Sequence, residues 1–438
     1  MPKTLVVIGA GPKGAAIATK AAVLSHLKIK QVNVVLFDPD GAGAAWDGKH
    51  GYTDGEQELC TSAIRDLGYP YDRATPTASA AAAMQAAFSW SHFSVESGHG
   101  PVEYRNWVEL GTPRPRHKDF AEYIAWAVRR SGFPVLPQKV VAIERTPSGW
   151  KISAMDPQSG SLNTFDSDGV VVTGSGGNLS NPLITPANPR VFDGRSFWGN
   201  QAQVLARLTA DPDPQVVIIG GGGTGAAIAA WFCRAGVTHM PITIVGSQPT
   251  LWSRAGHFFE DKIFSDDSYW SGLTTDSKWD FVRRLSQGTV WESVLDKLSA
   301  HPNIVYHCAH AVRLKTSTSP VPLGEPVAVE AELGSPPPPQ PRGAPRQPVV
   351  ATGILEGTVF IDARGFDAWD FLRLLHPSLR PHFSNRTTVE DEIDFSLSVG
   401  GSFPHPGLHI PMHGWIQGPG AANLMALGWM ADRILSAY

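Results

Sequence analysis

The sequence predicts an α/β fold with two Rossmann-like units, the first of which is completed by the C-terminal part of the chain. Two observations carry this prediction. A glycine-rich turn beginning at Gly9 lies between an apolar strand and an Ala-rich helix, and the same pattern begins again at Gly220. The chain has 438 residues, which is enough for two or three domains with a buried core.

The first unit opens with a strand at 4–8, an uninterrupted apolar run that is typical of a strand buried on both faces. An Ala-rich helix at 12–25 and a second strand at 32–37 complete a βαβ motif. A polar, irregular stretch follows at 39–73. Further helices are expected at 78–93 and 118–131, and further strands at 135–144, 150–154 and 169–172.

The first turn, Gly9-Ala10-Gly11-Pro12-Lys13-Gly14, fits the pattern G-x-G-x-x-G. In this pattern the first Gly permits a tight turn, the second lets the backbone approach a pyrophosphate, and the third lets helix and strand pack closely. The N-terminus of the helix then faces the phosphates. Asp38 ends the second strand, where a carboxylate holds ribose hydroxyls. The turn therefore predicts a dinucleotide site.

The second turn, Gly220-Gly221-Gly222-Gly223-Thr224-Gly225, has the same spacing between a strand at 216–219 and a helix at 226–235. The next strand, at 242–245, is followed by Gly246 and Ser247 rather than by an acid. A carboxylate there would repel a 2′-phosphate, so its absence favours NADPH, with Ser247 and Arg254 as candidate phosphate ligands. Arg254 fits a solvated surface charge equally well.

Two such units in one chain indicate that FAD binds to the first and the nicotinamide cofactor to the second, after which the chain returns to the FAD domain. A strand at 358–362 and a last helix at 421–437 are expected to make that return. The helix N-terminus at Gly420 and Ala421 would stabilise negative charge on a reduced flavin, or is an ordinary helix cap. We also expect Trp46 and Gln57 to contact FAD.

The expected domains are 1–210 for FAD, 211–350 for NADPH with a Pro-rich surface insertion at 317–348, and 351–438 for the return.

Composition excludes several classes of function. The net charge of −4 gives no reason to expect nucleic acid or an anionic membrane as a partner. The three cysteines, Cys60, Cys233 and Cys308, include no Cys-x-x-Cys pair, which argues against a disulfide reductase or a zinc knuckle and fits a reducing cytoplasm. The N-terminus does not resemble a cleaved signal peptide, and the apolar runs are too short to span a membrane. We expect a cytoplasmic homo-oligomer.

Several segments resemble a known family in their residues and in their order. They are Gly11-Pro12 in the first turn, 59–67 with its ending Ile64-Arg65-Asp66-Leu67, 88–93, 116–126, the loop at 257–264, and 361–366. Together they resemble the class B flavoprotein monooxygenases, and among these the enzymes that N-hydroxylate amino acids and diamines. The resemblance implies that NADPH reduces FAD, that O₂ forms a C4a-hydroperoxyflavin, and that a substrate amine becomes a hydroxylamine, as in secondary metabolite biosynthesis. The flavin supplies the reactive oxygen, so no protein nucleophile or metal is expected.

The sequence departs from the family pattern at three places. Trp198 replaces a His of related monooxygenases, which argues against the alternative of a Baeyer–Villiger or sulfur-oxidising enzyme. Asp261-Lys262 replaces Asn-Glu, and Arg65 replaces the Lys that binds the substrate carboxylate in ornithine enzymes.

These departures lead to a prediction about the substrate. Cations at Lys49, His50 and Arg65, with His117-Lys118 nearby, suit a dicarboxylate, so we expect L-aspartate as the substrate, with Asp261 also in its site. Two alternatives remain: an ornithine, lysine or diamine hydroxylase, and a loop whose charges simply face solvent.

Overall fold

The computed structural model describes residues 2–73, 75–96, 103–174, 176–179, 183, 188–237, 239–286, 288–316, 329–338, 342–344, 348–401, 403 and 406–438. The chain forms two compact units. Unit one comprises Met1–Gly176, Gly256–Lys278 and Ala368–Tyr438, and unit two comprises Gly177–Ala255 and Trp279–Asp367. In the described part of the chain, no helix is both long and apolar enough to cross a membrane.

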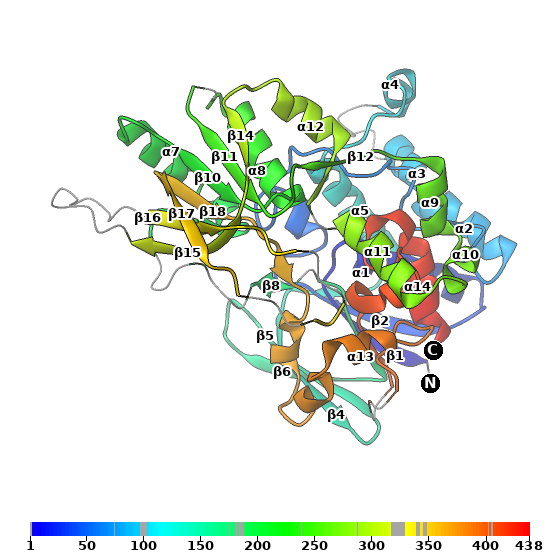
Figure 1. The fold of residues 1–438 in the computed structure, drawn as a ribbon. Helices are drawn as coiled ribbons and strands as arrows, with labels where there is room; N and C mark the ends of the chain where they lie inside the picture. The colour runs from blue at the N-terminus through cyan, green and yellow to red at the C-terminus, as the bar shows by residue number, and fades with distance from the viewer. Residues whose placement is uncertain are drawn as a thin grey trace. The chain divides into compact units, whose positions relative to one another are not determined.

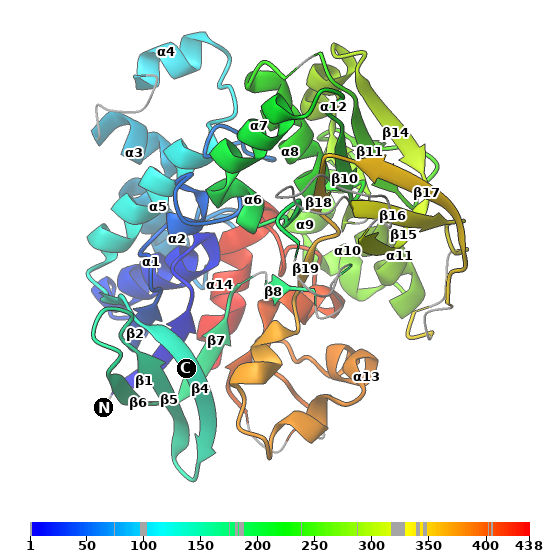
Figure 2. The same cartoon turned by 90° about the vertical axis from the view of Figure 1, so that its left-hand side faces the viewer.

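Unit one is built on a parallel five-stranded sheet with the order β20-β7-β1-β2-β3. Its strands are β1 (Lys3–Ile8), β2 (Val32–Phe37), β3 (Val135–Leu136), β7 (Gly169–Val172) and β20 (Leu408–His409). Leu5 and Val7 of β1 pack on the same core as helices α1 (Pro12–His26), α5 (His117–Ser131) and α14 (Leu427–Ser436). Val6 faces the other way, toward the antiparallel sheet of β4 (Lys139–Thr146), β5 (Gly149–Met155) and β6 (Leu162–Ser167) (Figure 2).

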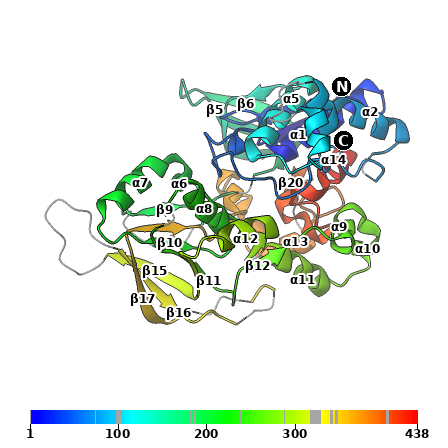
Figure 3. The same ribbon diagram turned by 90° about the horizontal axis from the view of Figure 1, so that it is seen from above.

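Unit two repeats this arrangement with the strand order β14-β11-β10-β18-β9. Its strands are β9 (Val191–Asp193), β10 (Val216–Ile219), β11 (Ile242–Gly246), β14 (Ile304–Cys308) and β18 (Val359–Asp362). Val216 and Ile218 share a core with residues of α7 (Gln201–Ala210) and α8 (Gly223–Arg234), two helices labelled in Figure 1. Val217 and Ile219 face the antiparallel sheet of β15 (His310–Thr316), β16 (Val329–Gly334) and β17 (Ala351–Gly357) (Figure 3). The predicted α/β fold with two Rossmann-like units is confirmed.

Shorter elements complete both units. In unit one they are η1 (Ala44–Trp46), α2 (Ala78–Phe88), α3 (Trp90–Glu96), α4 (Tyr104–Glu109), α9 (Phe258–Ser265), α10 (Asp267–Ser271), η2 (Asp370–Leu374), η3 (Arg380–Phe383), α13 (Arg386–Asp391), η4 (Pro411–Ile416) and η5 (Leu424–Ala426). In unit two they are β8 (Gly177–Asn178), α6 (Ser196–Gly199), β12 (Trp252–Arg254), β13 (Thr289–Trp291), α12 (Glu292–Ser299) and β19 (Phe366–Asp367). Helix α11 (Thr275–Ser286) begins in unit one and ends in unit two.

The observed division differs from the expected one in three ways. The strand at 358–362 does not return to the FAD unit, because β18 pairs with β10, and the return begins at Ala368. The segment Gly256–Lys278 belongs to unit one although it lies between parts of unit two. The expected insertion includes β16, whose Val329, Ala331 and Leu333 are buried, so this part does contribute to a core. Residues 317–328 of the insertion lie outside the described residues.

The expected helix at 78–93 is also interrupted. Ser89 has extended backbone angles and ends α2, and a new helix, α3, begins at Trp90. The Trp90 N–H donates to Asp66 Oδ2 at 2.9 Å, so the start of α3 is fixed by a side chain from a distant loop. Such a contact has no local signal in the sequence.

The buried His409 in unit one is held at both ring nitrogens. Its Nδ1 lies 2.8 Å from the Ser396 carbonyl oxygen and its Nε2 lies 2.8 Å from the Tyr438 hydroxyl. The carbonyl can only accept, so Nδ1 donates and Nε2 accepts the Tyr438 proton. Burial lowers the pKa of His409 to about 4, which keeps the ring neutral in the folded protein.

This buried histidine predicts a pH-dependent stability. Between the unfolded pKa of 6.5 and the folded pKa of about 4, only the unfolded chain binds the proton, so the free energy of unfolding falls as pH decreases through this window. His409→Gln has no imidazole to titrate, so its free energy of unfolding lacks this pH dependence. The difference in free energy of unfolding between the wild type and the variant should therefore shrink by roughly 2 kcal/mol between about pH 7 and pH 5. Urea unfolding of both proteins at each pH measures this, and a constant difference would contradict it.

Candidate cofactor and substrate sites

The first glycine turn has the geometry of a pyrophosphate cradle. Gly9 has φ +106°, and a Cβ added to Gly14 would lie 2.2 Å from the Gly9 carbonyl oxygen. A Cβ added to Gly11 would meet no described atom within 4 Å. The first and third glycines are therefore fixed by the turn and its packing, whereas the middle one faces open space, as close backbone approach to a phosphate requires.

Asp38 lies beside this turn, as predicted. The Ala10 N–H donates to Asp38 Oδ2 at 3.0 Å and the Asp40 N–H donates to Oδ1 at 3.1 Å, so the carboxylate is oriented by backbone donors. Burial is the main influence on the pKa of Asp38, and raises it. Pro12 and Lys13 open helix α1, and burial lowers the pKa of Lys13 to about 8, which still leaves its amine mostly charged near neutral pH. These residues fit a dinucleotide with anionic phosphates.

Backbone hydrogen bonds and a ring stack connect Trp46 and Gln57, the residues expected to contact FAD, to the first glycine turn. The Gly43 N–H donates to the Ala10 carbonyl at 3.1 Å, and three residues later Trp46 stacks on the ring of His117 with centroids 4.7 Å apart. The His117 N–H in turn donates to the Gln57 carbonyl at 2.8 Å. The Nε2 atom of Gln57 is buried and has no hydrogen-bond partner among the described residues. An orphaned donor of this kind fits a ligand with acceptor oxygens.

The second glycine turn repeats the first. Gly220 has φ +134°, and a Cβ added there would lie 2.3 Å from the Ala363 carbonyl oxygen. A Cβ added to Gly225 would lie 2.1 Å from the Gly220 carbonyl oxygen. Gly222 and Gly223, just before Thr224 in helix α8, would meet no described atom within 4 Å. This turn also fits a pyrophosphate.

The end of β11 carries the expected Ser247. Its Oγ lies 3.2 Å from Nδ1 of His310 at the start of β15. The Arg254 guanidinium lies over the ring of Trp291, 4.9 Å from its centroid, a contact that holds a cation at this end of unit two. Sequence reasoning missed His310, because it follows Ser247 by 63 residues and only the pairing of β11 with β14 brings the two together.

The two residues that depart from the family pattern, Arg65 and Asp261, form an ion pair. Arg65 Nη2 lies 3.0 Å from Asp261 Oδ2, and the side chains are only 20% and 17% exposed. Arg65 also lies over the Tyr69 ring, 5.7 Å from its centroid, and its Nη1 donates to Met425 Sδ at 3.0 Å. The sequence predicts that Arg65 meets a substrate carboxylate by itself. In the structure its charge is already paired with Asp261.

Two anchors on the C-terminal side of Asp261 hold the segment that carries it. Asp267, at the start of α10, pairs with Arg433 of α14. The Trp270 indole N–H donates to the Trp415 carbonyl at 3.0 Å. These bonds explain why this segment belongs to unit one, and they place the Asp261 carboxylate beside Arg65.

The other cations expected in the substrate site each have local partners, solvent exposure or burial of their own in this structure. Lys49 and His50 are exposed, and His50 Nδ1 pairs with Asp47 Oδ2 at 2.9 Å. Burial lowers the pKa of His117 to about 4, so it is neutral near pH 7. Lys118 pairs with Glu56. These positions are fixed by local acids and by burial, which the pattern of cations alone did not reveal.

Gly420 and Ala421 do not begin a helix, which corrects the expected helix N-terminus at the flavin. The Asn423 side chain accepts from the Met425 N–H and starts η5, and α14 begins only at Leu427. Ala421 is fully buried, and a Cβ added to Gly420 would lie 2.8 Å from the Ala426 Cβ. Close packing, rather than helix capping, therefore accounts for these two small residues.

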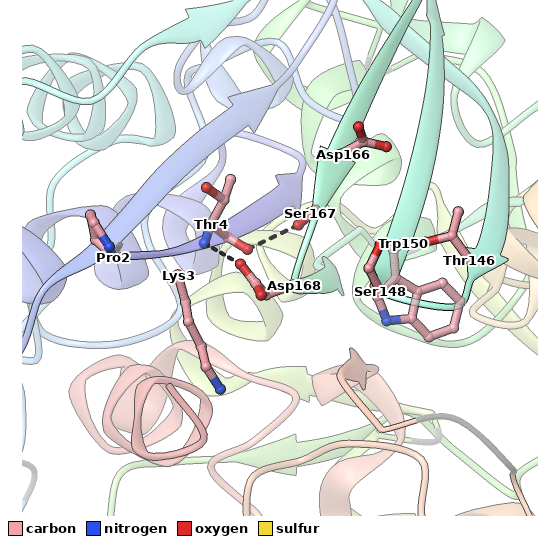
Figure 4. Close-up of a pocket in the computed structure, with 10 residues that line it drawn as sticks. Pro2, Lys3, Thr4, Thr146, Ser148, Trp150, Asp166, Ser167 and Asp168 are labelled. Carbon is pink, nitrogen blue, oxygen red and sulfur yellow. Dashed lines mark hydrogen bonds between the residues drawn. The ribbon is translucent and has the colours of Figure 1, made fainter.

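A polar cleft of about 370 Å³ lies elsewhere in unit one, lined by Lys3, Thr4 and Asp168 among others. Figure 4 shows Thr4 held between Asp168, which accepts from its N–H at 2.8 Å, and Ser167, which donates to its carbonyl at 3.0 Å. The cleft is at the amino end of β1, whereas dinucleotides bind at the carboxyl ends of such strands. It is therefore separate from the cofactor cradle after Ile8.

Two Rossmann-like units, each with a packed glycine turn that leaves its middle glycine open, define a class of proteins with two dinucleotide-binding units. No family model matches the chain. Among curated proteins, L-lysine N6-monooxygenase MbtG of Mycobacterium sp. (strain MCS) is 32% identical, over 100% of this chain and 95% of the relative. The protein of that name from Mycobacterium tuberculosis (strain ATCC 25618 / H37Rv) is 30% identical with the same coverage. The chain belongs to the flavin-dependent N-hydroxylating monooxygenases.

Solved structures agree with this assignment. Lysine monooxygenase NbtG from Nocardia farcinica has a TM-score of 0.78 and 26% identity, and 99% of each chain is covered. Ornithine N-hydroxylase KtzI from Kutzneria sp. 744 shares the fold with a TM-score of 0.69 at 16% identity. The chain is thus an FAD- and NADPH-dependent N-monooxygenase that hydroxylates an amine.

Proposed function

We propose that the substrate is L-lysine or a close aliphatic analogue such as L-ornithine, and that its side-chain amine becomes the hydroxylamine. The observation that carries this proposal is the Arg65–Asp261 ion pair, 3.0 Å long and mostly buried. An adjacent cation and anion complement the carboxylate and ammonium groups of a zwitterionic amino acid. The names of the relatives, L-lysine N6-monooxygenase, support the same substrate. This replaces the preference for L-aspartate.

The charge of Asp261 disfavours L-aspartate in two ways. A second substrate carboxylate would meet this anion at close range, which is unfavourable in a partly buried site. Asp261 would also keep an adjacent α-ammonium group protonated, and a protonated amine has no lone pair with which to attack oxygen. The reacting amine is therefore to be sought at the far end of the substrate, away from the ion pair.

The chain's own residues hold the reactants and need no nucleophile of their own. Asp38 and the backbone around Gly11 would hold the ribose and pyrophosphate of FAD, and the backbone around Gly222 would hold the pyrophosphate of NADPH. Once bound, FAD supplies the redox chemistry that activates O₂. Arg65 and Asp261 would fix the amino-acid head group, so that the flexible side chain presents its amine in one place.

A substrate panel tests the proposal. L-Lysine, L-ornithine, cadaverine and L-aspartate are compared by coupled NADPH oxidation and by hydroxylamine formed. We expect L-lysine or L-ornithine to give kcat/KM roughly tenfold or more above cadaverine, which lacks the carboxylate. Hydroxylamine from L-aspartate, with none from L-lysine or L-ornithine, would overturn the substrate and leave the N-monooxygenase class intact.

Removing the guanidinium of Arg65 should affect amino acids and diamines differently. Arg65→Met should raise the KM for L-lysine about tenfold or more with little change in kcat, because the lost contact is made equally before and during reaction. For cadaverine the KM should stay within about twofold. Arg313→Met, which removes an exposed ion pair with Glu332 in unit two, is the matched control. Equal losses for both substrates would show that Arg65 is structural.

A further inference from the structure

A chain of side-chain hydrogen bonds runs from His117 through Thr53 to Gln57 in unit one. His117 Nδ1 lies 3.2 Å from Thr53 Oγ1, and Thr53 Oγ1 donates to Gln57 Oε1. The Gly55 N–H also donates to Thr53 Oγ1 at 3.1 Å. The chain ends at the buried Nε2 of Gln57, which finds no acceptor within the described part of the protein.

The donors and acceptors of Thr53 determine the direction of this chain. A hydroxyl has one proton to donate and two lone pairs that accept. The single Thr53 proton is donated to Gln57 Oε1, so the amide of Gln57 turns its NH₂ group away from Thr53. One lone pair of Thr53 Oγ1 accepts from the Gly55 N–H. The other is left for His117 Nδ1, which donates to it in the tautomer that carries the ring proton on Nδ1.

His117 is suited to hold one end of the chain. Burial lowers its pKa to about 4, so the ring is neutral near pH 7 and carries one N–H. Its ring stacks on Trp46, with an interplanar angle of 27°, and its backbone N–H donates to the Gln57 carbonyl at 2.8 Å. His117 thus holds Gln57 through both the main chain and the side chain. Both the His117 ring and its backbone N–H make these contacts as neutral groups.

We propose that Thr53 and His117 are positioning residues that orient the Gln57 amide, so that its NH₂ group donates a hydrogen bond to the bound FAD. The position supports this, because Trp46 and His117 connect Gln57 to the Gly43–Ala10 contact of the first glycine turn. FAD presents phosphate and carbonyl oxygens, which accept hydrogen bonds and would satisfy the orphaned donor. The orientation of Gln57 toward FAD does not depend on which amine is hydroxylated.

Four variants test the donor and its orientation. Gln57→Leu removes the amide, Gln57→Glu replaces the donor with an acceptor of the same shape, Thr53→Val removes the hydroxyl, and Thr53→Ser keeps it. The FAD dissociation constant is measured on apoprotein by flavin fluorescence, together with the visible spectrum and the reduction potential of the bound flavin. None of these readouts requires turnover.

We expect Gln57→Leu and Thr53→Val each to weaken FAD binding about tenfold, and Gln57→Glu to weaken it more, because an anion would face acceptor oxygens. Thr53→Ser should stay within about twofold of the wild type. The double variant Thr53→Val/Gln57→Leu should bind no more weakly than Gln57→Leu, since the two residues act as one unit. The flavin spectrum should shift in the same way in both single variants.

A matched control is Thr358→Val in unit two, where the Thr358 hydroxyl donates to Asp211 at 2.7 Å and accepts from the Gln215 N–H at 3.0 Å. It should leave the FAD constant and the flavin spectrum unchanged. Wild-type FAD binding by Gln57→Glu would overturn the proposed donor. Fully additive losses in the double variant, or failure of Thr53→Ser to rescue, would overturn the positioning role of Thr53.

Discussion

Gly11→Val should give a folded protein that has lost nearly all its FAD. A Cβ at Gly11 meets no described atom within 4 Å, so the folded unit tolerates the side chain, but that side chain occupies the space into which the pyrophosphate must come. We expect the FAD dissociation constant to rise roughly a hundredfold or more, equivalent to about 3 kcal/mol. Flavin absorbance after reconstitution and thermal unfolding of the apoprotein measure the two effects separately.

Gly14→Val is the informative contrast for this prediction. Its Cβ would lie 2.2 Å from the Gly9 carbonyl oxygen and 3.2 Å from Leu36 Cδ2, so helix and strand cannot pack as they do. This variant should lose stability as well as FAD. If Gly11→Val retained FAD at the wild-type level, the first turn would not be the flavin cradle.

Gly222→Val should separate the two cofactors. Unit two has its own open glycine at this position, so the variant should keep its flavin and lose reduction by NADPH. We expect kcat/KM for NADPH to fall roughly a hundredfold or more in stopped-flow measurements of flavin reduction. Reduction of the same flavin by dithionite should be unaffected, because that reaction does not use the second turn.

The control for Gly222→Val is Gly353→Val on β17. A Cβ at Gly353 also meets no described atom within 4 Å, and the residue is exposed on a strand of the antiparallel sheet of unit two. It should leave NADPH-dependent reduction unchanged. Loss of flavin from Gly222→Val, with NADPH affinity retained, would reverse the assignment of the cofactors to the two turns.

The two predictions depend on features that repeat between the units. Each unit has a parallel five-stranded sheet with helices on one face and a three-stranded antiparallel sheet on the other. Each has a first glycine with positive φ and a third glycine that has no room for a Cβ. The difference lies at the end of the second strand, where unit one has Asp38 and unit two has Ser247. We expect that difference to distinguish an unphosphorylated ribose from a 2′-phosphate.

Substrate preference shows where sequence reasoning was weakest. The sequence shows Arg65 as a departure from the family pattern and predicts that its charge meets a substrate dicarboxylate. The structure pairs it with Asp261, 196 positions further along the chain, on a segment of unit one that is flanked in sequence by parts of unit two. His117 stands next to Lys118 in the sequence, but burial keeps its ring neutral, as in a structural histidine.

The sequence by itself determined the two glycine turns, the acid after β2 and its absence after β11. These features are local: strand, turn and helix lie within about 25 residues of one another, and Gly is required where φ is positive or a Cβ has no room. Only the tertiary structure decided that β18 joins unit two, that Arg65 meets Asp261, and that Thr53 contacts both His117 and Gln57. Those outcomes depend on strand pairing, burial and hydrogen bonds between residues that are distant in the sequence. An apolar run does not specify the strand it pairs with, and an isolated charge does not specify its partner.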